Sequence, residues 1–290
     1  MSGVDVAKQA GIAGSVCALV SSFLNPFDVT KIRLQNQSVG VDGVVKYPGL
    51  ISGARVIFKE EGLAGLGRGV EASVYRELTY STVRIGAYEP LRSYLGGGEA
   101  SPGVKFLSAL LSGGTGAALA SPLDLVKTRM QASLPPNAPP YSNTFRALLE
   151  IFHREGVSQG LYKGWMVTSA RAAVLTSAQL GSYDTIKNNI LVKDFGMQDG
   201  LLLHLCAAMS AGVITTTAAN PVDVIKTRYM SDKVGKYASP FDCVRQTLAV
   251  DGVRGFFKGW LPSYWRLGPH TVISLIMIEH IRLLLGLTTI

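Results

Sequence analysis

The sequence has few cysteines and histidines, and neither type shows a metal-ligand or catalytic spacing. The three cysteines, Cys17, Cys206 and Cys243, lie far apart and form no Cys-x-x-Cys pair, so we expect neither a zinc site nor a disulfide framework. The four histidines match no His-Glu-x-x-His motif and no catalytic triad. We therefore expect reduced structural thiols, no metal, no cofactor and no enzymatic chemistry.

Charge is also scarce, and the little that is present is unbalanced. Of the 290 residues, 17% are charged and 47% are hydrophobic, which excludes a disordered chain. The formal net charge of +8 suits nucleic acid, an anionic membrane surface or an anionic solute as the partner. The basic residues are spread through apolar stretches rather than gathered in a patch, which disfavours nucleic acid. The N-terminal residues match no signal or transit peptide, so we expect any targeting signal to be internal.

Three internal repeats organise the chain. A Pro-x-Asp-x-x-Lys block begins at Pro26, Pro122 and Pro221. Each block is followed by an acidic residue directly before a glycine, and then by a second glycine a few residues later. Each repeat ends with an acidic residue and a basic residue three positions apart. Because these elements recur in the same order, they predict repeats over residues 5–97, 103–192 and 199–287.

Uncharged runs indicate where the chain crosses a membrane. Residues 9–27, 106–123 and 200–222 contain no Asp, Glu, Lys or Arg, and each run leads into a proline block. At 1.5 Å per residue, such helices span most of a hydrocarbon core of ~30 Å. We place a second, charge-interrupted span of each repeat at 70–92, 165–187 and 260–285, and amphipathic surface helices at 50–59, 145–153 and 241–250. These patterns predict an all-α membrane protein of six transmembrane helices, with a soluble bundle of glycine-rich helices as the alternative.

This arrangement resembles the mitochondrial carrier family over essentially the whole chain, and the threefold proline block is the specific feature. The resemblance implies six tilted helices with threefold pseudosymmetry, which open alternately to the two sides of the mitochondrial inner membrane. It also implies that both termini face the intermembrane space. The organelle rests on the resemblance alone, since related carriers serve other membranes. A monomer is the simplest expectation because the transport path lies within one chain.

The repeated charges are expected to form a gate on the matrix side. A proline bends a helix, and Asp and Lys three positions apart share one helix face. Symmetry then pairs Asp28 with Lys127, Asp124 with Lys226, and Asp223 with Lys31. Gln35 and Gln131, four residues after the lysine, are expected to brace these pairs, whereas Met230 stands at the third position. The alternative is that these charges only solvate helix ends.

Two further sets of residues follow from the same symmetry and resemblance. A cytosolic gate is expected from Glu89 with Arg92, Asp184 with Lys187, and Glu279 with Arg282. The family's cardiolipin sites, in which glycine amides and helix N-termini hold the lipid phosphate, correspond to Gly69, Gly164 and Gly259. The first repeat departs from this pattern because Gly67 replaces its aromatic residue. Plain helix-start chemistry is the alternative for these glycines.

Symmetry-related arginines mark the candidate substrate site. Arg76, Arg171 and Arg266 each stand twelve residues before the start of the last repeated element, which is ~18 Å of helix and reaches roughly the bilayer midplane. Charges at that depth normally line an aqueous path or a binding site. Arg76, Tyr80 and Arg84 share one helix face at spacings of four residues. A structural role, such as snorkelling toward the interface, is the alternative for some of these arginines.

The chemistry of these levels favours a small dianion. Forked guanidinium donors match carboxylates, and two cationic levels about 12 Å apart suit two separated carboxylates. We expect no acidic residue at these levels, which disfavours an amino acid as substrate. The local sequence around the arginines resembles that of the 2-oxoglutarate/malate and dicarboxylate carrier branch, to which uncoupling proteins are related. That resemblance implies substrate contacts at Arg76, Tyr80, Arg84, Arg171 and Arg266.

The resulting expectation is an antiporter that exchanges dicarboxylates such as 2-oxoglutarate, malate or succinate, with phosphate as a candidate counter-substrate. A fatty-acid-dependent proton or anion transporter of the uncoupling type is the main alternative. A membrane enzyme is disfavoured because no nucleophile-base pair or metal cluster occurs at matching depth. A non-transporting receptor on the same fold is disfavoured because the charges of both gates are intact.

Overall fold

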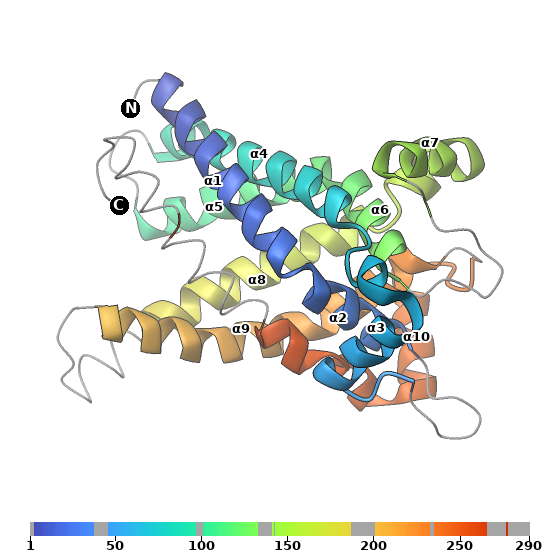
Figure 1. Ribbon diagram of the computed structural model, residues 1–290. Helices are drawn as coiled ribbons and strands as arrows, with labels where there is room; N and C mark the ends of the chain where they lie inside the picture. The colour runs from blue at the N-terminus through green and yellow to red at the C-terminus, as the bar shows by residue number, and fades with distance from the viewer. Residues whose placement is uncertain are drawn as a thin grey trace.

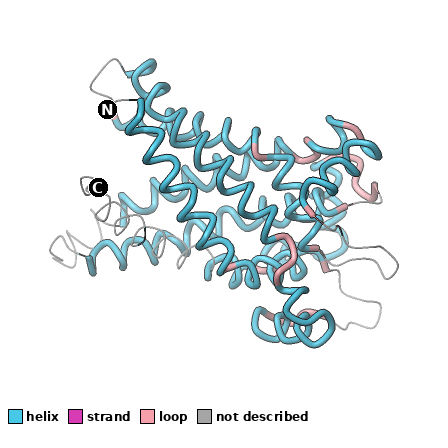
Figure 2. The backbone as a smooth tube through the Cα atoms, turned by 45° about the horizontal axis from the view of Figure 1, so that its top comes forward, coloured by secondary structure: helices cyan, strands magenta, loops and turns pink. Residues whose placement is uncertain are grey.

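A computed structural model describes residues 3–37, 46–96, 101–132, 141, 143–186, 201–232, 235–265 and 277. Within these ranges every regular element is helical (Figures 1 and 2), which confirms the expected all-α fold. The elements are α1 (Gly3–Phe23), α2 (Asn25–Asn36), α3 (Leu50–Leu66), α4 (Val70–Gly96), α5 (Pro102–Leu119), α6 (Ser121–Gln131), α7 (Thr144–Glu155), η1 (Val157–Leu161), α8 (Trp165–Thr185), α9 (Leu201–Ser231), α10 (Pro240–Asp251) and η3 (Val253–Phe257).

The repeated prolines act at the joints between long helices. Pro26 and Pro122 each occupy the first turn of a new helix, so α1 breaks before α2 and α5 breaks before α6. A proline is tolerated there because its missing N–H is one that an α-helix leaves unsatisfied at its start. The bend between α5 and α6 is 60°. In the third repeat, α9 continues through Pro221 as one element.

The described helices differ in length and in apolar character. Among the described residues, no single helix is both long and apolar enough to cross a bilayer by itself, whereas the bent pair Gly103–Leu119 with Ser121–Gln131 has the length and composition to do so. The expected span at 260–285 lies almost entirely outside the described residues.

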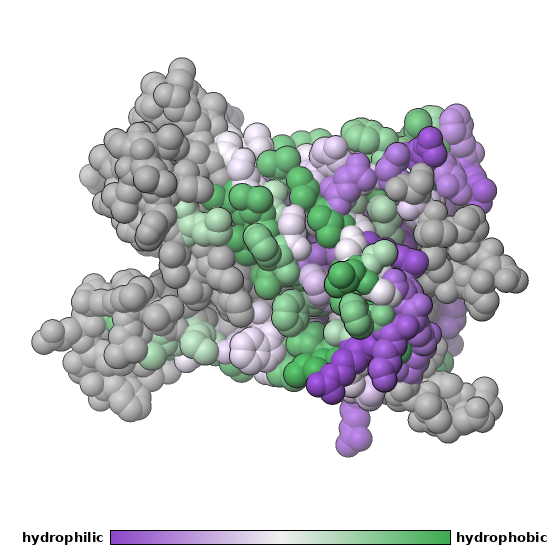
Figure 3. All heavy atoms as spheres, in the orientation of Figure 1, coloured by the Kyte–Doolittle hydropathy of each residue, from purple (hydrophilic) through white to green (hydrophobic). Residues whose placement is uncertain are grey.

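The long helices pack side by side in a fixed order. Helix α4 lies between α1 and α5, and α8 lies between α5 and α9. The surface helices α3, α7 and α10 gather at one end of the molecule, opposite the N-terminal ends of α1 and α9 (Figure 1). On the face shown in Figure 3, hydrophilic residues concentrate at this end, while the flank along the long helices is largely apolar.

Each surface helix is anchored by a small apolar core. Val29 and Ile57 join α2 to α3, Leu125 and Ile151 join α6 to α7, and buried residues of α9 and α10 form a third cluster that includes Cys243. Burying such side chains contributes about 1.5–3 kcal/mol each. The apolar cores therefore fix the ends of α2, α6 and α9, which carry the repeated charges.

Candidate functional site

Six charges from α2, α6 and α9 form three buried ion pairs, which we call the ion-pair ring. Its members are Lys127 Nζ with Asp28 Oδ2 at 2.7 Å, Lys226 Nζ with Asp124 Oδ2 at 2.9 Å, and Lys31 Nζ with Asp223 Oδ2 at 2.6 Å. Each pair joins two different repeats, in the pairing that the symmetry of the sequence predicts. Buried pairs of this kind require good geometry to offset the loss of hydration. The distances are short enough to meet that requirement.

The two glutamines that are expected to brace the ring form hydrogen bonds to residues of other repeats. Gln131 Nε2 donates to Asn25 Oδ1 at 2.8 Å, and Gln35 Oε1 accepts a hydrogen bond from Thr227 Oγ1 at 2.8 Å. Both partners, Asn25 and Thr227, lie outside the ion-pair ring. Each side chain lies against a glycine of another repeat: Gln131 packs on Gly69, and Gln35 packs on Gly259. They stabilise the contact between repeats rather than the ion pairs.

Two of the predicted substrate arginines bind carboxylates of the ring. Arg76 Nε donates to Asp124 Oδ1 at 3.0 Å, and Arg171 Nε donates to Asp223 Oδ1. Each of these aspartates therefore joins a lysine through one oxygen and an arginine through the other. The third arginine, Arg266, lies outside the described residues. The arginines and the ring thus form one continuous network rather than two separate layers.

The face formed by Arg76, Tyr80 and Arg84 is present on α4. The guanidinium of Arg76 lies 5.0 Å from the centroid of the Tyr80 ring, and that of Arg84 lies 5.4 Å from it. Both distances fall within the range of cation–π attraction. Tyr80 therefore contacts the guanidiniums of both arginines.

Glu77 is a member of this site that the sequence reasoning overlooked. The expectation that no acidic residue shares the arginine levels is wrong, because Glu77 Oε1 accepts a hydrogen bond from Arg76 Nη1. The Glu77 side chain is only 7% exposed. Its position immediately after Arg76 was the available signal, but neighbours along a helix usually point in different directions. Arg76 therefore lies between two carboxylates, those of Glu77 and Asp124.

The expected cytosolic gate is only partly covered by the described residues. Arg92 Nη1 lies 3.3 Å from Glu89 Oε1, one turn apart on α4, and both side chains are substantially exposed. The side chain of Asp184 and residues Lys187, Glu279 and Arg282 lie outside the described part. The pair observed here joins two turns of α4.

The glycines expected at lipid sites have a structural reason to be glycine. Gly69, Gly164 and Gly259 all adopt positive φ, at 72°, 86° and 75°. A Cβ at these positions would lie 2.9 Å, 3.0 Å and 3.1 Å from the nearest side-chain atom of another repeat. Positive φ together with close approach favours glycine whether or not a ligand is present.

At the boundary of the first and second repeats, a protein carboxylate occupies an anion position. The N–H of Thr144, at the start of α7, donates to Glu71 Oε2 at 3.1 Å. Helix N-termini attract anions through their free N–H groups. The corresponding residues of the other repeats are Met166 and Leu261, which carry no charge. This position is therefore filled by the chain itself in the first repeat.

A second threefold set, not predicted from the sequence, clamps the surface helices. The second basic residue of each proline block binds the acidic residue at the end of its own surface helix and a backbone carbonyl of another repeat. Arg33 binds Glu61 and the Gln131 carbonyl, Arg129 binds Glu155 and the Met230 carbonyl, and Arg228 binds Asp251 and the Gln35 carbonyl. The recurrence of arginine two positions after each lysine was the signal that could have revealed this clamp.

The comparisons with known proteins agree with the repeats and the ring. A family model described as "Mitochondrial carrier protein" matches three times, over residues 3–99, 98–194 and 198–288. The chain belongs to this family, which confirms the resemblance inferred from its motifs. Family members are transporters rather than enzymes.

Relatives match almost the full length of the chain. The Mitochondrial substrate carrier family protein ucpB of Dictyostelium discoideum is 39% identical over 96% of this chain and 95% of the relative. The Mitochondrial citrate transporter F of Aspergillus niger is 37% identical over 94% and 90%. The Mitochondrial uncoupling protein 1 of Arabidopsis thaliana is 37% identical over 93% and 89%. Proteins named for different transport activities are therefore similar to this chain to nearly the same degree.

Proposed function

We propose that the protein is an antiporter of the mitochondrial inner membrane that exchanges small dicarboxylates such as 2-oxoglutarate, malate or succinate, with phosphate as a candidate counter-substrate. The observation that carries the proposal is the binding of Arg76 and Arg171 to carboxylates of the ion-pair ring. These guanidiniums are already placed to hold carboxylate groups. A dianionic substrate would compete with Asp124 and Asp223 for the same donors.

This competition supplies a physical link between binding and opening. When a substrate carboxylate takes the Arg171 guanidinium, Asp223 keeps its ion pair with Lys31 and loses one charge-assisted hydrogen bond. The same argument applies to Asp124, which would retain Lys226. A ring weakened in this way favours the state in which the matrix side is open. The ring then acts as the matrix gate.

The alternating-access cycle requires a second gate on the opposite side. We assign it to Glu89, Arg92, Asp184, Lys187, Glu279 and Arg282, with both termini on the intermembrane-space side. In a structure whose ion-pair ring is closed, the Glu89–Arg92 pair within α4 fits an open second gate. A single chain contains the complete path, so we assign a monomer. We also assign lipid phosphates such as those of cardiolipin to the Gly164 and Gly259 boundaries, and with weaker support to that of Gly69, where Glu71 already occupies the anion position.

Two relatives define the competing functions. The similarity to a protein named as a citrate transporter favours a tricarboxylate, and the similarity to one named as an uncoupling protein favours fatty-acid-dependent proton conduction. Both alternatives use an anion site lined by cations. They differ from dicarboxylate exchange in two respects: the identity of the anion that drives uptake, and the need for a counter-substrate.

Reconstitution into liposomes tests the proposal. Uptake of labelled 2-oxoglutarate, malate and citrate is measured with dicarboxylate, phosphate, aspartate, ATP or nothing inside. Uptake of a dicarboxylate that depends on internal dicarboxylate or phosphate is the expected result. Preference for citrate would replace the substrate class. No uptake under any loading, together with collapse of a pH gradient by oleate, would establish the uncoupling function instead.

The Arg171→Ala variant ties the activity to the site. We expect it to insert into the membrane and to lose exchange, because the second repeat would no longer contribute a guanidinium to the site. Arg154→Ala is the matched control, since Arg154 lies on α7 with its side chain 76% exposed and pairs with Glu150 of the same helix. Substantial exchange by Arg171→Ala would contradict the assigned site.

A further inference from the structure

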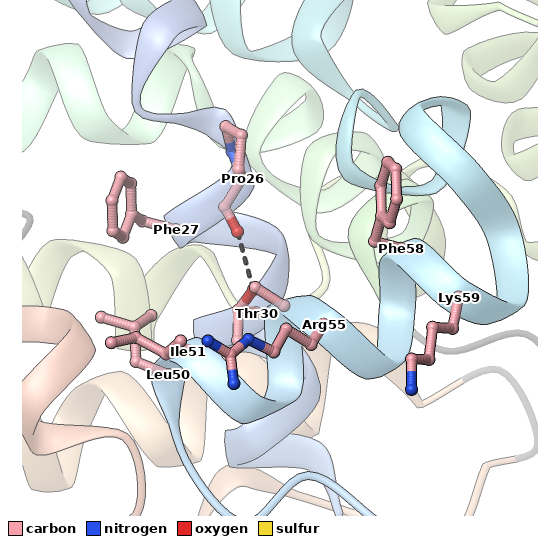
Figure 4. Close-up of a pocket in the computed structure, with 9 residues that line it drawn as sticks. Pro26, Phe27, Thr30, Leu50, Ile51, Arg55, Phe58 and Lys59 are labelled. Atoms are coloured by element: carbon pink, nitrogen blue, oxygen red, sulfur yellow. Dashed lines mark hydrogen bonds between the residues drawn. The ribbon is translucent and has the colours of Figure 1, made fainter.

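An apolar groove lies between α2 and α3 in the first repeat, away from the ion-pair ring. It has a volume of about 410 Å³ and is lined by Pro26, Phe27 and Thr30 of α2 and by Ile51, Ala54 and Phe58 of α3, among others (Figure 4). The one hydroxyl among these six side chains donates to the Pro26 carbonyl at 2.8 Å. That hydroxyl is therefore used within α2. The groove offers an apolar surface rather than hydrogen-bonding groups to a ligand.

Small side chains in the first repeat leave this space open. Thr30 and Ala54 correspond to Val126 and Leu148 in the second repeat, and both of those residues pack in the apolar core between α6 and α7. In the third repeat the corresponding residues are Ile225 and Val244, which are also larger than their counterparts in the first. The groove is thus a feature of the first repeat rather than a general consequence of threefold symmetry.

Two cations, Arg55 and Lys59, stand one turn apart on α3 at the edge of the groove (Figure 4). Across the described ranges, neither forms an ion pair. The neighbouring acids are already engaged, because Glu60 lies 2.8 Å from Lys46 and Glu61 binds Arg33. Within the described part of the chain, the groove therefore carries two positive charges that pair with no carboxylate.

The rim of the groove is apolar and open to the surroundings. Phe27, Ile51 and Phe58 are 40%, 68% and 51% exposed. In a membrane carrier, an exposed apolar rim on an amphipathic surface helix faces lipid at the interface. Cations at that depth attract the phosphates of anionic lipids. The combination of an acyl-sized apolar groove with two uncompensated cations complements a molecule that has an apolar chain and an anionic head.

We propose that this groove binds one acyl chain of an anionic membrane phospholipid, whose phosphate lies against Arg55 and Lys59. The site lies within one repeat, whereas the glycine-associated positions lie between repeats, so the two are distinct. Arg55 is replaced by Leu149 in the second repeat, and Lys59 by His153. Because these charges differ between the repeats, we expect one such lipid per protein molecule, bound in the first repeat.

Native mass spectrometry of the full chain, purified in detergent with added phosphatidylglycerol, tests the site. Two changes are made separately: Arg55→Leu with Lys59→Ala removes the charges, and Ala54→Leu fills the groove with the residue found in the second repeat. We expect each to lower the number of retained phosphatidylglycerol molecules by one. Arg245→Leu is the matched control, because Arg245 occupies the position of Arg55 in the third repeat. The control should retain the wild-type number.

The remaining outcomes also decide the proposal. An unchanged number of bound lipids in the charge variant would overturn the proposal. Thermal unfolding shows whether each variant is folded, and the charge variant still tests the proposal if Ala54→Leu does not fold. Phosphatidylcholine should be retained at least tenfold more weakly than phosphatidylglycerol, and equal retention would overturn the role of the cations. Displacement of phosphatidylglycerol by equimolar oleate would identify a free fatty acid as the occupant and overturn the assignment of a phospholipid. Exchange activity is measured separately, so failure of this site leaves the test of dicarboxylate transport unaffected.

Discussion

Arg171 and Lys31 share the carboxylate of Asp223: Lys31 Nζ lies 2.6 Å from Oδ2, while Arg171 Nε donates to Oδ1. The lysine comes from α2, the aspartate from α9 and the arginine from α8, so one carboxyl group joins elements of all three repeats. Arg76 and Lys226 share Asp124 in the same manner. A ligand that takes hold of the arginines therefore acts directly on the ion pairs.

The forked guanidinium of Arg171 is expected to contribute to exchange beyond its charge. Arg171→Lys keeps a cation but loses the planar donor geometry that holds a carboxylate at two points. We expect the exchange rate to fall roughly tenfold, equivalent to about 1.4 kcal/mol. The melting temperature should change little because the Lys31–Asp223 pair remains. Initial rates in proteoliposomes and thermal unfolding in detergent measure the two effects, and wild-type exchange by Arg171→Lys would show that the fork is dispensable.

The pairing within the ring is testable by charge reversal. Asp28→Lys and Lys127→Asp each place like charges together in a buried site, and breaking such a pair typically costs about 3–5 kcal/mol. The double variant restores opposite charges, so we expect most of the lost stability and exchange to return. The measurement is the melting temperature of both single variants and the double variant. If the double variant loses as much stability as the two single variants lose together, the two side chains do not interact.

The sequence predicted the partners of the ring because symmetry constrains them. Three equivalent helix ends that meet around one axis leave few ways to pair three aspartates with three lysines. Symmetry does not predict the hydrogen bonds of Gln35 and Gln131 in the same way, since the direction of each side chain depends on local packing against Gly259 and Gly69. Spacing along a helix predicts the face on which a residue lies. It does not predict which of two nearby groups on that face the side chain will bond.

Contacts between sequence-adjacent residues were the hardest to anticipate. Periodicity groups residues three and four positions apart, and Glu77 lies one position after Arg76. The long arginine side chain bends back to its neighbour, which no pattern of spacing reveals. The groove beside α3 was equally hidden, because it arises from the sizes of Thr30 and Ala54 relative to their counterparts rather than from any motif.

Removing the charge of Glu77 should strengthen substrate binding. Glu77 and Asp124 both neutralise Arg76, so Glu77→Gln leaves a more positive guanidinium for the substrate. We expect the KM for 2-oxoglutarate to decrease by up to about tenfold, which corresponds to about 1.4 kcal/mol. Glu150→Gln, on the exposed face of α7, is the control and should leave KM unchanged. A rise in KM would mean that Glu77 positions Arg76 rather than competes for it.

Gly164 should be required for stability independently of lipid. An alanine at φ 86° is strained, and its Cβ would lie 3.0 Å from Met230 Cγ. We expect Gly164→Ala to destabilise the protein by about 1–3 kcal/mol. Gly114→Ala is the control, since a Cβ there meets no atom within 4 Å. Thermal unfolding with and without added cardiolipin separates the two roles, because a loss seen only with lipid present would contradict the steric explanation.

Acid should weaken the clamp between α2 and α3. The hydrogen bonds from Arg33 hold the pKa of Glu61 below its ordinary value, and burial opposes this only in part. A carboxyl whose folded-state pKa is depressed contributes stability above its unfolded pKa of about 4.3, and the contribution disappears as pH falls through the folded value. Glu61→Gln should therefore lower the melting temperature at pH 7, and the difference from wild type should shrink as the pH falls below about 4. Glu60→Gln, which breaks only the exposed pair with Lys46, should change the melting temperature little at either pH. A difference between wild type and Glu61→Gln that stays constant from pH 7 to pH 3 would show that the ionised form of Glu61 contributes nothing to the clamp.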